Sequence, residues 1–82
     1  MRRGQEVKFL IEMDLFGTNI EGLHGVYLKT DENTGKHLFY VPVLGEWCEL
    51  ASGSFELALS GRVTKKNKEF VSRVRQLGSF EN

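Results

Sequence analysis

Two histidines and one cysteine, His24, His37 and Cys48, are the side chains in this sequence best suited to bind a soft metal ion. We expect His37 to lie opposite Leu28 in a hairpin, and His24 precedes Leu28 by four positions on the same face. At ~3.3 Å per residue this arrangement separates the two histidines by about 13 Å, which is too far for one ion to join them. The sequence therefore predicts no metal site.

Covalent catalysis would need a serine, threonine or cysteine activated by a neighbouring base. The only cysteine, Cys48, is expected to point into the core, where a thiol is structural rather than reactive. No phosphate-binding glycine loop, dinucleotide fingerprint or catalytic dyad occurs in the sequence. We therefore predict a non-enzymatic protein with no catalytic residues and no cofactor.

The cellular compartment follows from the same residues. A lone cysteine cannot form an internal disulfide and fits a reducing compartment. The basic pair Arg2-Arg3 is not followed by an apolar stretch long enough for a signal peptide, and no segment approaches the ~20 apolar residues that span a bilayer. These features predict a cytoplasmic protein that does not insert into membranes.

Five strands should position these side chains. Alternating apolar residues predict strands at 6–13, 25–29, 36–43, 47–50 and 55–59, with a long loop at 14–22 and a polar hairpin loop at 30–35. The dipeptide Gly45-Glu46 predicts a two-residue type II′ turn with positive φ at the glycine. That turn would pair Val43 with Cys48 and Val41 with Leu50, and it would bury Cys48 rather than Glu49.

The hydrophobic period changes to that of a helix from about Lys65 to Leu77, with Thr64 as its N-cap and Gly78 as its stop. One face of this helix carries Asn67, Phe70, Val71, Val74 and Leu77. Residues 61–82 hold six Lys and Arg against two Glu, whereas residues 1–60 hold five Lys and Arg against nine Asp and Glu. This split is typical either of a basic helix lying on an acidic body or of a basic arm for nucleic acid.

The predicted central sheet is apolar on both faces. One face should carry Val26, Leu28, Phe39, Val41, Cys48 and Leu50, and the other Tyr27, Leu38, Tyr40, Pro42, Leu44 and Trp47. We expect the Tyr40 ring to cover Gly25 on the neighbouring strand. Because a domain this small has one core, the second face must be covered by the C-terminal helix or by a partner.

Three segments, Gly4–Phe9, Gly17 and Ile20–Leu28, resemble the opening of SH3-like small barrels. These include the KOW-type domains of translation and transcription factors and small accessory subunits of photosynthetic complexes. The resemblance covers roughly residues 4–59, with Phe55–Leu57 as the closing strand. It implies a mainly β fold, namely a five-stranded SH3-like barrel at 1–60 followed by a basic amphipathic α-helix at 61–82 within one domain. The Ala-Leu-Tyr-Asp-Tyr motif of proline-binding SH3 domains is absent, so polyproline recognition is not implied.

The long loop and the aromatic face form the predicted partner-binding surface: Phe16, Ile20, Tyr27, Tyr40, Leu44 and Trp47. Large rigid rings supply contact area at low entropic cost. We therefore expect a protein-binding module or a small accessory subunit of a larger complex, and a homo-oligomer joined through the aromatic face is a structural alternative. The other alternative is a KOW-like nucleic-acid-binding domain that uses the basic residues of the helix: Lys65, Lys66, Lys68, Arg73 and Arg75.

Overall fold

The computed structural model describes residues 1–76, except for the side chains of Arg75 and Gln76. Its elements are β1 (Glu6–Phe9), β2 (Asp14–Leu15), β3 (Thr18–Asn19), β4 (His24–Thr30), β5 (His37–Val41), β6 (Glu46–Leu50), β7 (Phe55–Leu57), a 3-10 turn η1 (Leu59–Gly61) and α1 (Lys65–Gln76). Five strands form one antiparallel sheet in the order β6-β5-β4-β1-β7, and β2 and β3 form a separate hairpin. The predicted mainly β class is confirmed. The sheet is not closed into a barrel, because within residues 1–76 the edge strands β6 and β7 do not pair with each other.

The inner face of the sheet carries the core, which consists of Val7, Phe9, Ile20, Tyr27, Phe39, Val41, Cys48 and Leu50. Three phenylalanine rings connect distant strands across this core. Phe39 meets Phe9 edge-to-face at 5.5 Å between ring centroids and meets Phe55 at 4.7 Å. Because Phe55 comes from the edge strand β7, its ring joins that edge to β5 although the two strands share no hydrogen bonds.

The two faces of β4 are the reverse of those predicted. Tyr27 points into the core and is only 6% exposed, whereas Leu28 lies on the outer face against α1. Four successive residues, 25–28, are buried, so apolar alternation alone could not distinguish the two sides of this strand. A register shift between Tyr27 and Lys29 also interrupts the pairing with β5. Tyr27 is therefore a core residue.

The β5–β6 hairpin has a longer turn than predicted. Phe39 pairs with Cys48 and Val41 with Glu46, so the connection is the four residues 42–45. Pro42 explains the difference, since a residue without an N–H cannot continue the ladder. Gly45 does hold a positive φ of 67°. The register differs from the predicted one by an even number of residues, which keeps Cys48 buried and Glu49 exposed as expected.

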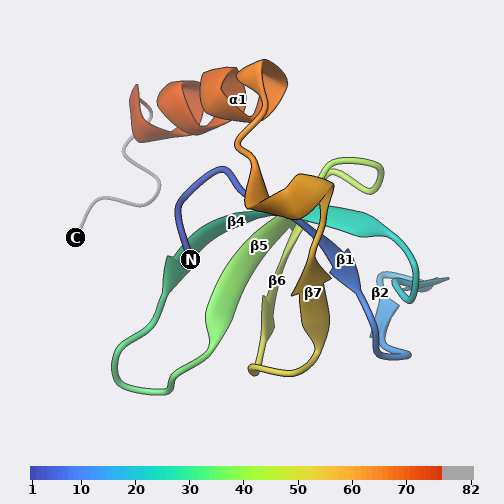
Figure 1. Cartoon of the computed structure of the whole chain (residues 1–82). Coiled ribbons are helices and arrows are strands. Elements are labelled where there is room, and N and C mark those ends of the chain that lie inside the picture. The colour runs from blue at the N-terminus through green and yellow to red at the C-terminus, as the bar shows by residue number, and fades with distance from the viewer. Residues whose placement is uncertain (77–82) are drawn as a thin grey trace.

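The predicted C-terminal helix is confirmed as α1. Thr64 is its N-cap, because the Thr64 Oγ1 accepts a hydrogen bond from the backbone N–H of Asn67 at 3.1 Å. The helix lies on one side of the sheet, near β4 (Figure 1). Its apolar residues Phe70, Val71 and Val74 pack there against Leu28, Leu38 and Tyr40 on the outer face. The predicted end at Leu77 and stop at Gly78 lie outside the described residues. Within residues 1–76, no helix combines the length and the apolar character needed to cross a bilayer.

Candidate binding groove

A row of four side chains crosses the outer face of the sheet from β1 to β6. Cα pairing joins Glu6 to Val26, Val26 to Tyr40, and Tyr40 to Trp47. Directly paired residues in an antiparallel sheet point to the same side. The helix covers the Tyr40 part of this row, because the Phe70 ring stacks on the Tyr40 ring at 4.6 Å and 24°. The other part, around Val26, lies next to the first turn of the helix, and Val26 itself is only 3% exposed.

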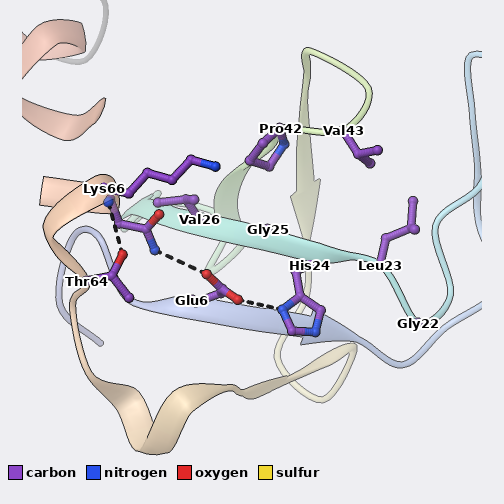
Figure 2. A pocket seen from close by; sticks show the side chains of 11 residues that line it. Glu6, Gly22, Leu23, His24, Gly25, Val26, Pro42, Val43, Thr64 and Lys66 are labelled. Atoms are coloured by element: carbon purple, nitrogen blue, oxygen red, sulfur yellow. Dashed lines mark hydrogen bonds and ion pairs between the residues drawn. The ribbon is translucent and has the colours of Figure 1, made fainter. Parts of the chain in front are cut away.

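A groove of about 560 Å³ borders this part of the outer face. It runs between the start of α1, the first half of β4 and the β5–β6 loop. Apolar side chains form one part of its lining: Leu23, Val26, Pro42 and Val43. In Figure 2, Pro42 and Val43 stand on one side of β4, and Thr64 and Lys66 stand at the helix end. Val43 is 71% exposed, which makes it one of the most exposed apolar side chains among the described residues.

A hydrogen-bonded cluster closes one end of the groove. The Glu6 carboxylate contacts His24 Nδ1 at 2.6 Å and accepts a weak hydrogen bond from Asn67 Nδ2 at 3.5 Å (Figure 2). Asn67 is 6% exposed, and Glu6 explains why a polar residue occupies the apolar face of the helix. The cluster joins β1, β4 and α1, so it holds the groove walls together. Its oxygens and nitrogens are also the polar groups that could fix the orientation of a bound segment.

The six side chains predicted to bind a partner fall into three groups. Ile20 is fully buried in the core, and Tyr27 packs in the same core with 6% exposure. Tyr40 and Leu44 are half-buried, Tyr40 beneath Phe70 and Leu44 against the core. Phe16 and Trp47 remain exposed, at 79% and 38%. Trp47 packs beside Tyr40 at 4.7 Å between ring centroids and borders α1 through Phe70.

Phe16 lies at the tip of the β2–β3 hairpin, which occupies most of the segment predicted as a long loop at 14–22. Leu15 pairs with Thr18, so Phe16 and Gly17 form a two-residue turn with φ values of 50° and 87°. Positive φ at both positions is the property of type I′ turns, which favour Asn-Gly. A residue with a Cβ costs about 1–2 kcal/mol in this left-handed conformation. The Phe16 ring is therefore held outward in a strained position.

Most groove residues were not predicted as site residues. The sequence predicts Pro42 on the second apolar face but not as a binding residue, and it predicts Glu6 only as the start of the first strand. Four parts of the chain come together to form the groove: residue 6 and residues 22–26, 42–43 and 64–67. Local sequence patterns do not reveal which distant segments become neighbours in the fold. Asn67 was the available signal, since a lone polar residue on an apolar helix face requires a partner.

The basic residues proposed for nucleic acid lie on the solvent side of α1. Lys65, Lys66, Lys68 and Arg73 are exposed, and the Arg75 side chain lies outside the described part of the chain. Of these residues, Lys66 also lines the groove.

The two histidines contact different residues in the structure: His24 contacts Glu6, and His37 contacts Thr30. His37 lies opposite Thr30 rather than Leu28, and its Nδ1 contacts the Thr30 Oγ1 at 2.7 Å. Within the described residues there is no group of three or more His, Cys, Asp or Glu side chains that could hold a metal ion.

Cys48 should be protected from alkylation in the folded protein. Burial raises the pKa of its thiol from 9.0 to about 11, so at pH 8 the reactive thiolate fraction is about 100-fold lower than in the unfolded chain. Because the folded pKa is the higher one, the same burial makes the free energy of unfolding fall as the pH rises from about 9 to about 11. Iodoacetamide labelling followed by mass spectrometry, with and without urea, measures the protection. Equal labelling rates in both conditions would show that Cys48 is accessible.

Comparisons of this chain with protein-family models, with curated proteins and with solved structures found no match. The class that the geometry defines is a small mainly β protein with one helix on the outer face of its sheet and an apolar groove beside that helix.

Proposed function

We propose that the protein is a non-enzymatic protein-binding module, acting as a small accessory subunit of a larger cytoplasmic complex, and that it has an SH3-like fold. The strand order β6-β5-β4-β1-β7 supports the fold, because β1 lies between the long β4 and the last strand, as expected for the SH3-like proteins that the sequence resembles. The two-stranded excursion between β1 and β4 occupies the place of the long first loop in that family. The buried lone cysteine supports a reducing compartment.

The observation that carries the binding function is the incomplete cover of the outer face. The helix buries Leu28 to 1% exposure, yet it leaves a concave apolar strip that ends in the exposed Val43. A pocket with an apolar floor and a few polar groups at one end suits recognition of a chain segment with an apolar anchor. Its Glu6 cluster is already internally hydrogen-bonded, which favours binding over acid–base chemistry.

Substitution of Val43 by Glu should abolish binding of the protein partner while leaving the fold intact. The side chain is 71% exposed, so the folded chain loses little, but a carboxylate in the groove would have to be desolvated when a partner docks. We expect recovery of the partner by tagged full-length chain from an extract of the source organism to fall at least about tenfold, which corresponds to ~1.4 kcal/mol.

Leu57→Glu is the matched control for this experiment. Leu57 is also an exposed apolar residue, at 48%, but it lies on the edge strand β7 and does not line the groove. This variant should recover the same partner as the unsubstituted chain. Equal recovery by the Val43→Glu chain, or loss of the partner with Leu57→Glu alone, would contradict the proposed role of the groove.

The second candidate function is nucleic-acid binding through α1. It is favoured by the first turn of the helix, where Lys65, Lys66 and Lys68 are exposed and no acidic residue is present. Contacts with phosphates weaken steeply between roughly 0.05 M and 0.2 M salt, whereas an apolar protein contact does not. Anisotropy of a fluorescent single-stranded RNA across this salt range therefore separates the two functions.

A further inference from the structure

We propose that the groove accepts the Phe16 ring of a second copy of this chain, so that the protein associates head to tail. This inference rests on the proposed function, because it names the occupant of the same groove. The hairpin tip formed by Phe16 and Gly17 is called the knob below.

The aromatic ring of the knob is mostly exposed to solvent and packs little against its own chain. Phe16 is 79% exposed, and it does not line the groove of its own chain. Its φ of 50° is one that an asparagine or glycine would adopt more readily. Strained conformations of this kind cluster at functional sites, among them the clamps that hold ligands. The knob is therefore a protruding aromatic anchor.

The groove has the size and lining to receive this anchor. Its volume of about 560 Å³ lies within the range of roughly 300–1,000 Å³ that holds a small organic ligand, which leaves room for a phenyl ring and the turn that bears it. The exposed Pro42 and Val43 and the half-buried Leu23 would contact the ring. A buried aromatic anchor in an apolar pocket is the usual energetic centre of a protein interface.

Charge favours a second copy as the occupant. Residues 9–21, which contain the knob, hold no Lys or Arg, and their acidic residues, Glu12, Asp14 and Glu21, are all exposed. The exposed Lys66 lines the helix end of the groove, and the exposed Lys65 and Lys68 belong to the same first turn of α1. The acidic surroundings of the knob would thus approach the basic rim of the groove, while Glu6 within the groove is already paired with His24 and Asn67. Such complementarity orients the two copies and speeds their association.

The symmetry of this contact has a measurable consequence. Knob and groove are different surfaces, so the contact is heterologous, and each dimer retains one free knob and one free groove. Association should therefore continue beyond the dimer as the protein concentration rises.

Sedimentation velocity on full-length chains tests the proposal with two variants that each remove one half of the contact. Phe16→Asn removes the ring and suits the positive φ, so the hairpin should persist. Val43→Glu blocks the groove and keeps the knob. Between about 10 μM and 1 mM, the range of weak protein contacts, the unsubstituted chain should form dimers and longer species, and each variant alone should remain monomeric.

Mixing the two variants gives the decisive result. The knob of the Val43→Glu chain should enter the groove of the Phe16→Asn chain, producing a one-to-one heterodimer that grows no further. Leu57→Glu, the control on β7, should associate like the unsubstituted chain. A monomeric unsubstituted chain, self-association of either variant, or a mixture that stays monomeric would each overturn the proposal. If the unsubstituted chain is monomeric and Val43→Glu still loses the captured partner, the groove binds a different protein and only this inference fails.

Discussion

Deleting residues 62–82 should lower the free energy of unfolding by several kcal/mol. The deletion removes α1 and uncovers Leu28, Leu38 and Tyr40 on the outer face. Re-exposing one fully buried leucine costs about 1.5–3 kcal/mol, and Leu28 is only 1% exposed beneath the helix. Urea denaturation followed by Trp47 fluorescence measures the loss, and the loss of Phe70 from the neighbourhood of Trp47 should also shift its emission.

A pair of point variants keeps the helix and controls for the deletion. Val74→Ala removes a side chain that packs on Leu28, whereas Ser72→Ala changes an exposed position of the same helix. The first variant should lower stability and the second should not. An unchanged urea midpoint after deletion of 62–82 would mean that α1 is a free arm, which would favour the nucleic-acid function.

Phe9→Ala should destabilise the protein by about 3–5 kcal/mol, the range found for large-to-small substitutions of buried aromatic residues. Phe9 is fully buried, its ring meets the Phe39 ring at 5.5 Å, and it lies over Gly25 so closely that an added Cβ there would be 2.4 Å from Phe9 Cζ. Removal of the ring leaves a cavity where three strands meet.

Phe16→Ala is the matched control, since it is the same substitution at a residue that is 79% exposed. It should change the free energy of unfolding by no more than about 0.5 kcal/mol. Equal effects of the two substitutions in thermal or urea unfolding would contradict the assignment of Phe9 to the core and Phe16 to the surface.

Local patterns were sufficient to predict the helix and to predict which residues of β5 and β6 face the core. Thr64 and the spacing of Phe70, Val71 and Val74 define α1 without reference to the rest of the chain. Likewise, the alternation in β6 placed Cys48 inside and Glu49 outside even though the predicted turn was wrong. Periodicity identifies faces well where one side of an element is clearly polar.

Features that depend on tertiary pairing were not predictable in the same way. Gly25 was expected beneath Tyr40, but it pairs with Val7 and lies against the Phe9 ring on the inner face. The reason is that β4 has buried residues at four consecutive positions. Which of its two faces points into the core therefore depends on the strands and the helix packed against it. The groove is likewise a product of segments far apart in the sequence, and the knob depends on a strained turn that residue propensities disfavour.

A photoreactive benzoylphenylalanine at position 43, introduced into the full-length chain in the source organism, reports what the groove contacts. The same group at position 57, on the far edge of the sheet, provides the background. Protein binding in the groove predicts a discrete protein adduct from position 43 and none of that mass from position 57. If the groove of one copy binds the knob of another copy, that adduct would contain peptides from the knob. Adducts of nucleic acid alone from position 43, or the same protein adducts from both positions, would contradict the assignment of the groove as a protein-binding surface.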